Sequence, residues 1–390
     1  MPSAKQFLGK CALLLLPFAA PLSFPALVLF GSGEFTSQET IIHRQQYEPD
    51  EVMVGLAFSN PWRTFKLEAT QQRKPAILAL GSSRIMPLRG RWFRQPERFY
   101  NASGGISVLW HFEEFLRRIS ATDGPKLLII ALDQWDLNGN SSPIDSKDRS
   151  DPYYHKEQEP LRLLQDNWQN IYTLLAAGRI PMHRVLSNLI SGHSIGLTAI
   201  QDHGGFLNDG SYPPQPSIVA AAHGLTDPLF YSYALARIET GATPGSSRYE
   251  HAQHIDPERL DTLRSLLNYC QTRRIHLIAF CPPFANQITQ VMKNRGDSYG
   301  YLNEINPLLS PEFQSRGFTF KNFADMRTLS LTDADACYPD GYHSSDKTYL
   351  KILIDLAEAD SKLNGQVDLK RLKTMFNEST VPCIVRELHE

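Results

Sequence analysis

The sequence lacks the features that mark several specialised protein classes. Its 390 residues hold 39 lysines and arginines against 41 aspartates and glutamates, a formal net charge of −2. Without a basic tail or stripe, nucleic acid is not an expected partner. Internal repeats and long low-complexity tracts are also absent, which excludes a repeat array. The 42% hydrophobic content is that of an ordinary globular protein with a large core.

Cysteine is scarce, and its spacing does not match the common zinc sites. No CxxC or Cys/His pair has metal-ligand spacing, so we expect neither a metal nor another cofactor. Cys11 lies in the N-terminal apolar run. In an oxidising compartment the other four cysteines could pair in three ways, and reduced structural thiols are the alternative. The five cysteines are Cys11, Cys270, Cys281, Cys337 and Cys383.

Only one long apolar run is present. Residues 11–30 contain no charge, and at about 1.5 Å per residue they are long enough to cross a hydrocarbon core of about 30 Å. Lys5 and Lys10 precede the run, whereas Glu34 and Glu39 follow it. The positive-inside rule therefore predicts a cytoplasmic N-terminus and an extracytoplasmic bulk, periplasmic or on the cell surface.

This pattern predicts that residues 1–31 form a cytoplasmic tip and a transmembrane anchor, so the membrane is an expected partner. A cleaved signal peptide is the alternative, because Ala19-Ala20 and residues 31–33 offer small side chains for cleavage. Residues 32–74 are polar and irregular, which favours a stalk between the anchor and a folded domain.

Strand and helix patterns alternate along the rest of the chain. The predicted strands are short apolar runs at 76–80, 99–101, 126–132, 275–280 and 318–323. The predicted helices cover residues 106–119, 159–177, 257–272, 285–294 and 345–362. Alternation of this kind predicts an α/β fold, a three-layer sandwich with a central parallel sheet. We place this domain at 75–365, an irregular insertion or cap at 139–250, and a C-terminal tail at 366–390.

Polar residues that follow the strands form a candidate catalytic set, because ligands bind at the carboxyl ends of parallel strands. Ser83 ends the turn Gly81-Ser82-Ser83 after the first strand, where a serine is exposed as a nucleophile. It requires a base, which His343 can supply, while Asp340 can orient the imidazole. Taken singly, Ser83 also suits a helix N-cap, and His343 a structural role.

These residues resemble the sequence blocks of SGNH/GDSL hydrolases. The likeness rests on Gly81-Ser82-Ser83, on Asn101 to Gly105, and above all on Asp340-x-x-His343. It is nearest to DltD-like and alginate-acetylation-like membrane-anchored members. The resemblance implies an SGNH/flavodoxin-like fold and acyl transfer to, or removal from, cell-envelope polymers.

The resemblance also implies roles for individual residues. Ser83 matches the nucleophile, and the backbone N–H groups of Ser83, Gly104 and Gly105 match the oxyanion hole. The family's Gly-x-Asn-Asp block is missing after strand 126–132, where the chain reads Asp133-Gln-Trp-Asp-Leu-Asn138. Asn138 is the remaining candidate for the oxyanion amide.

Two functions from different classes follow. The first is a serine esterase or O-acyltransferase, whose partners are an acylated polysaccharide or acyl donor and other envelope assembly proteins. The second is a catalytically degenerate scaffold or binding subunit of a polysaccharide assembly system, which the missing Gly-x-Asn-Asp favours. A flavodoxin-like anchored domain is a third hypothesis, although residues 81–84 make a poor phosphate-binding loop.

Some neighbouring residues have simpler interpretations. We expect Arg84 to pair with a surface carboxylate. Asp133 and Asp136 are spaced as i and i+3 without an evident third ligand, so loop capping is favoured over a metal site. Trp110 and Trp135 are expected to belong to the core.

Overall fold

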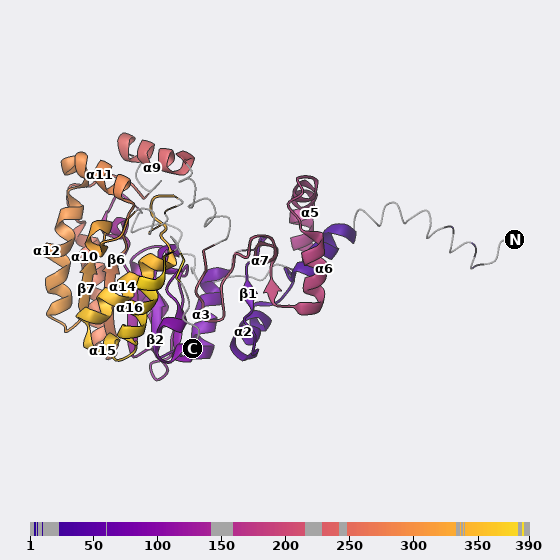
Figure 1. Cartoon of the computed structure of the whole chain (residues 1–390), viewed down its shortest axis with the longest axis horizontal. Coiled ribbons are helices and arrows are strands. Elements are labelled where there is room, and N and C mark those ends of the chain that lie inside the picture. The colour runs from indigo at the N-terminus through magenta and orange to yellow at the C-terminus, as the bar shows by residue number, and fades with distance from the viewer. Residues whose placement is uncertain are drawn as a thin grey trace. The chain divides into compact units, whose positions relative to one another are not determined.

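The structure is a computed structural model, and it divides into two compact units (Figure 1). Unit 1 comprises Met1–Pro61 and His155–Asn208, and unit 2 comprises Trp62–Tyr154 and Asp209–Glu390. The residues that the structure describes are 4, 6, 10, 23–59, 61–141, 159–214, 228–241, 248–332, 336, 338, 340–380 and 384–385.

Unit 2 is built on a five-stranded parallel sheet with the order β3-β2-β4-β6-β7. Leu78 of β2 lies opposite Leu128 of β4, which lies opposite Leu277 of β6. The predicted strands 76–80, 126–132 and 275–280 are therefore neighbours in one sheet, which confirms the predicted central parallel sheet. The strands are β2 (Ile77–Leu80), β3 (Phe99–Asn101), β4 (Leu127–Ala131), β6 (His276–Cys281) and β7 (Thr319–Asn322).

The middle of this sheet is covered on both faces. Every residue of β2 and β4 is buried, and successive strand side chains point to opposite faces. The strands are short unbroken apolar runs for this reason. The predicted α/β class with a central parallel sheet and packed helices is confirmed.

Two groups of helices pack on unit 2. In the first, the Tyr269 hydroxyl of α10 (Pro257–Thr272) donates to the Leu116 carbonyl of α4 (Trp110–Arg117), and Arg264 of α10 pairs with Glu312 of α12 (Tyr301–Gln314). Right-handed crossovers place these three helices on one face of the sheet. The second group is α14 (Asp346–Ala359), α15 (Ser361–Asn364) and α16 (Leu369–Glu378).

Local sequence explains where these helices start and stop. Asp256 accepts hydrogen bonds from the first N–H groups of α10, and Pro257 occupies the first helical position. Ser345 caps α14 in the same way. The predicted helix 345–362 is split because Asp360 accepts from the N–H groups of Lys362 and Leu363 and starts α15. The other helices of unit 2 include α3 (Trp62–Arg73), α9 (Pro228–Thr240) and α11 (Asn286–Asn294).

Unit 1 combines two segments that are far apart in the sequence. A two-stranded parallel pair joins β1 (Met53–Val54) to β5 (Ser194–Ile195). Gly196 follows with φ +99°, and a Cβ there would overlap the Gly55 carbonyl oxygen, so this position requires glycine. The helices are residues 23–32, α2 (Gln38–Tyr47), α5 (Pro160–Ala176), α6 (Met182–Ser191) and α7 (Leu197–Asp202). Their core contains Val28, Leu29, Ile171, Ile180, Val185, Leu197 and Ile200.

The predicted anchor falls partly outside the described residues, which omit 11–22. Among the helices that the structure does describe, none is both long enough and apolar enough to cross a membrane. Val28 and Leu29, at the end of the apolar run, are buried in the core of unit 1. This end of the run therefore packs against protein in the structure.

The remaining predicted segments are distributed between the units. Residues 32–74, expected as a stalk, contain α2 and β1 of unit 1 and α3 of unit 2, with Ile42 and Phe65 buried. Within the predicted cap 139–250, residues 159–208 belong to unit 1, while 142–158, 215–227 and 242–247 lie outside the described residues. In the predicted tail, α16 packs on α14 through a buried Leu372.

Candidate active site

The candidate site lies at the carboxyl ends of β2, β4 and β6. The chain passes from β2 to β3 on one side and returns to β4 on the other, and ligands bind at such a reversal of strand order. Ser83 is the first residue of the 3-10 helix η1 (Ser83–Ile85) that follows β2. Ser82 caps this helix, because its hydroxyl accepts a hydrogen bond from the Arg84 N–H.

The structure brings Ser83, His343 and Asp340 together. Ser83 Oγ lies 2.7 Å from His343 Nε2, although the two residues are 260 positions apart. On the other side of the imidazole, His343 Nδ1 lies 2.6 Å from Asp340 Oδ2. When Nδ1 carries the proton and donates to Asp340, Nε2 is free to accept the hydrogen of the serine hydroxyl. This is the geometry that an activated serine requires.

Asp340 is held as an oriented carboxylate. Its Oδ1 accepts from the backbone N–H groups of His343 at 2.9 Å and Tyr342 at 3.2 Å. Burial alone would raise the pKa of Asp340, but the hydrogen bonds and the charge of His343 outweigh it and lower that pKa. The side chain of His343 is 33% exposed and that of Asp340 is 18% exposed, so the acid is more enclosed than the base.

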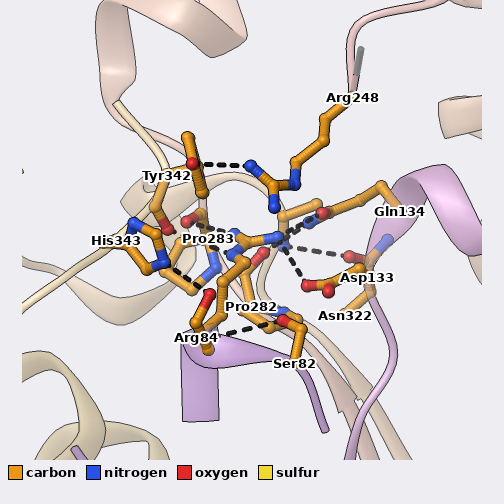
Figure 2. Close-up of polar contacts among 12 residues, drawn as sticks. Ser82, Arg84, Asp133, Gln134, Arg248, Pro282, Pro283, Asn322, Tyr342 and His343 are labelled. Atoms are coloured by element: carbon orange, nitrogen blue, oxygen red, sulfur yellow. Dashed lines mark hydrogen bonds and ion pairs between the residues drawn. The ribbon is translucent and has the colours of Figure 1, made fainter. Parts of the chain in front are cut away.

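Arg84, directly after Ser83, is the centre of a buried polar network (Figure 2). Its Nε donates to the Tyr342 carbonyl at 3.0 Å, and its Nη2 donates to the Pro283 carbonyl at 2.6 Å. Its Nη1 donates to Asp133 at 3.1 Å and to the Gln134 side chain at 2.7 Å. One guanidinium thus connects the turn that carries Ser83 to the ends of β4 and β6 and to the residue before His343.

The carboxylate partner of Arg84 is buried, which corrects the expectation of a surface pair. The side chains of Arg84 and Asp133 are 1% and 2% exposed. The guanidinium also lies over two aromatic rings, 5.1 Å from the Trp135 centroid and 4.8 Å from that of Phe284. The physical reason is the sheet itself: Asp133 follows β4, the neighbour of β2, so the two strand ends meet inside the domain.

Asp133 does not act as the expected loop cap, whereas the Asp136 carboxylate accepts a hydrogen bond from the Asp133 backbone. Asp133 precedes the 3-10 helix η4 (Gln134–Leu137) without a side-chain cap, since its carboxylate is bound to Arg84. Burial, and then the nearby Asp133 charge, raise the pKa of Asp136 well above its usual range. Among the described residues, no group of three or more His, Cys, Asp or Glu side chains could hold a metal ion.

A second arginine stands beside the triad. Arg248 Nη1 donates to the Tyr342 hydroxyl at 2.6 Å, and its guanidinium lies 4.8 Å from the Tyr342 ring centroid and 5.3 Å from that of Trp135. The Tyr342 ring in turn lies 4.3 Å from the His343 ring, centroid to centroid (Figure 2). Arg248 is exposed, whereas Trp135 is buried as expected.

Most of the predicted oxyanion donors are hydrogen-bonded to backbone carbonyls instead of facing Ser83. The Gly104 N–H donates to the Gly81 carbonyl at 3.0 Å, and the Gly105 N–H donates to the Ala102 carbonyl at 3.4 Å. The buried side-chain amide of Asn138 donates to the Glu250 carbonyl at 2.7 Å. Ser83 begins η1, and the first N–H of a helix has no partner within that helix.

The structure therefore does not direct Gly104, Gly105 or Asn138 at Ser83. The loop after β3 is tied to the end of β2, and Asn138 is held by residues that precede α10. Of the predicted oxyanion set, this leaves the N–H of Ser83 itself, the first residue of η1.

Sequence reasoning missed three residues around the triad: Arg84 as a buried connector, Tyr342, and Arg248. The position of Arg84 between two neighbouring strand ends was a usable signal, because charged residues inside a sheet domain need a partner. Tyr342 gave a weaker signal, because its one indication was that it directly precedes His343 in the sequence. Arg248 lies in an irregular segment that carries no pattern.

Comparison of the chain with protein-family models, with curated proteins and with solved structures gave no match. Any function must therefore be argued from the site and from the resemblance in its motifs.

Proposed function

We propose that the protein is a serine esterase or O-acyltransferase that works through Ser83, His343 and Asp340. The observation that carries the proposal is the aligned chain of contacts from Ser83 Oγ to His343 Nε2 at 2.7 Å and from His343 Nδ1 to Asp340 at 2.6 Å. The helix cap is Ser82 and not Ser83, so the Ser83 hydroxyl is not used for capping.

In the first half of the reaction, Ser83 Oγ attacks the carbonyl carbon of an ester. His343 Nε2 takes the hydroxyl proton as the C–O bond forms, and Asp340 stabilises the resulting imidazolium without taking its proton. The tetrahedral intermediate collapses, the alcohol leaves with the proton from Nε2, and an acyl group remains on Ser83.

In the second half, another hydroxyl attacks the acyl-serine. His343 Nε2 again takes a proton from the attacking oxygen and returns it to Ser83 Oγ as the acyl group departs. Water as the acceptor gives an esterase, and a sugar hydroxyl gives an O-acyltransferase. The same residues serve both reactions, so the acceptor decides between them.

The substrate class rests on the motif resemblance to SGNH/GDSL hydrolases, nearest to DltD-like and alginate-acetylation-like anchored members. On this basis the fold is a three-layer sandwich of the SGNH/flavodoxin type, and the substrate is a cell-envelope or exported polysaccharide. The N-terminal apolar run supports an extracytoplasmic, membrane-anchored location. The other partners are the acyl donor and further envelope assembly proteins.

The oxyanion side of the site supports a second candidate, a degenerate scaffold or binding subunit. Gly104 and Asn138 donate to backbone carbonyls, so Ser83 supplies the one oxyanion donor of the predicted set. Acyl transfer normally uses more than one donor, and loss of a donor costs about 10²–10³ in rate. In a scaffold the triad geometry would persist without turnover.

Acetate release distinguishes the two candidates. The purified full-length protein is given a small acetyl ester and an acetylated polysaccharide, alongside Ser83→Ala and the control Ser315→Ala, an exposed serine at the end of α12. The enzymatic proposal expects acetate release that Ser83→Ala abolishes and Ser315→Ala retains. Transfer to a sugar hydroxyl would identify the transferase branch. Release or transfer that persists in Ser83→Ala, or neither release nor transfer from any ester, would reject the enzyme and leave the scaffold.

A further inference from the structure

One face of helix α6 in unit 1 exposes large apolar side chains. Leu186, Leu189 and Ile190 are 47%, 45% and 91% exposed, and their i, i+3, i+4 spacing places them on the same side of the helix. Val185 of the same helix is fully buried in the unit 1 core. The helix therefore has a packed face and a separate apolar face that the described protein does not cover.

The exposed surface continues onto the helical residues 23–32. Leu27 and Phe30 are 41% and 67% exposed. The two helices are in contact there, because the Asn188 side-chain amide donates to the Gly31 carbonyl at 3.2 Å. A Cβ on Gly31 would lie 3.7 Å from Leu189 Cγ, so the two elements pack closely at this point. The apolar patch consists of Leu27, Phe30, Leu186, Leu189 and Ile190.

The sequence around α6 is poor in acidic residues. From residue 167 to residue 201 the sequence contains no aspartate or glutamate. Arg179 and Arg184 are exposed in this stretch, and so are His183 and His193. An exposed apolar helix face suits the boundary between acyl chains and headgroups.

Position along the chain identifies the occupant. The apolar run begins at residue 11 and continues directly into the helical residues that carry Leu27 and Phe30. If the first part of that run enters a membrane, these residues lie at the bilayer surface within a few residues of the anchor. A second copy of the chain or a soluble partner would give no reason for this continuity.

We infer that the apolar patch of unit 1 lies on the lipid bilayer, with Leu186, Leu189 and Ile190 buried at the interface. Unit 1 is then a membrane-surface module. The inference rests on the membrane location in the proposed function, but not on catalysis.

Photocrosslinking tests this placement in the full-length protein. Ile190→p-benzoylphenylalanine is reconstituted in vesicles of phosphatidylethanolamine and phosphatidylglycerol, and adducts are identified by intact mass. The matched control carries the same probe at Asp50, an exposed residue after α2. We expect a lipid adduct at position 190 and none at position 50. Protein dimers, or no adduct at position 190, would overturn the inference.

Two further variants separate the causes. With the probe at 190, Leu186→Ser with Leu189→Ser should reduce the lipid adduct, because it removes apolar surface from the patch. Both side chains are exposed, so their loss should leave the core intact. Arg184→Gln, on the side of α6 away from the patch, should leave the adduct unchanged. An adduct indifferent to Leu186→Ser with Leu189→Ser would contradict a specific docking face.

Vesicle flotation distinguishes a wrong membrane location from a wrong placement of the patch. Protein that floats with vesicles but gives no lipid adduct at 190 is anchored, and the patch is not on the bilayer. Protein that does not float contradicts the membrane location and the docking face together. Acetate release dependent on Ser83 tests the proposed chemistry independently of both outcomes.

Discussion

The two sides of Ser83 differ in how completely they are assembled. On the base side, His343 and Asp340 already stand at hydrogen-bonding distance, and Arg84 fixes the residue before His343. On the oxyanion side, Gly104 and Asn138 donate to backbone carbonyls. For the proposed reaction, the groups that transfer the proton are already aligned, whereas the Ser83 N–H is the remaining oxyanion donor of the predicted set.

This contrast has an energetic consequence. The base side is anchored by the buried pair of Arg84 and Asp133, so disruption of that pair should lower both stability and rate, whereas loss of the partly exposed His343 should lower mainly the rate. The donors on the other side are structural hydrogen bonds, so their loss should lower stability more than rate. Substitutions on the two sides should therefore separate into two classes.

The largest effect is expected from His343→Ala. Without the base, Ser83 Oγ keeps its proton, and kcat/KM should fall by about 10³-fold or more. Because the His343 side chain is one-third exposed, the unfolding transition should move little. Ester hydrolysis and thermal unfolding are measured on the same preparation. A variant that loses its fold would make the rate uninformative, and a folded variant with normal turnover would refute the assigned base.

Arg84→Met should affect stability most. It leaves the buried Asp133 carboxylate without its partner, which typically costs about 3–5 kcal/mol. It also releases the Tyr342 carbonyl, so the rate should fall in the fraction that remains folded. Denaturant unfolding gives the free energy. Arg84→Met with Asp133→Leu provides the control, since removal of both charges should restore much of the stability without restoring the rate.

Asn138→Ala tests the oxyanion side of Ser83. Its buried amide donates to the Glu250 carbonyl, and loss of that bond should cost about 1–3 kcal/mol. A working oxyanion donor would instead cost about 10²–10³ in kcat. We expect kcat to change much less than that. A loss of that size with normal stability would show that Asn138 reaches the reacting oxygen during turnover.

The smallest effect concerns pH. The folded protein holds the pKa of Asp340 below its unfolded value, so the carboxylate stabilises the fold above that value, about 3.9. This contribution is lost as the pH falls through the lowered pKa. The difference in unfolding free energy between the protein and Asp340→Asn should therefore be full at neutral pH and shrink in acid. A difference that grows in acid would contradict the assigned direction.

Much of the sheet could be predicted because its signals are local. Unbroken apolar runs mark β2 and β4, and Asp256 followed by Pro257 marks the start of α10. The chain order of Ser83 and His343, each at a loop expected on the same sheet edge, was enough to predict their proximity. Parallel pairing of the strands then brings Ser83 and His343 together, although 260 positions separate them in the sequence.

Other features depend on distant contacts and could not be predicted. The burial of Arg84 depends on Asp133, 49 residues away, and the hydrogen bond of Asn138 depends on Glu250, 112 residues away. Unit 1 joins segments on either side of residues 62–154, and its strands are two residues long. Such strands carry no pattern in the sequence, so the first segment resembled a stalk.

Covalent labelling of Ser83 tests the central claim most directly. The full-length protein is treated with a fluorophosphonate, and the modified serine is located by peptide mass mapping. We predict a single phosphonylated residue, Ser83, with labelling abolished by Ser83→Ala and strongly suppressed by His343→Ala. Labelling that survives Ser83→Ala, or that maps to Ser82, would contradict the assignment of Ser83 as the activated nucleophile.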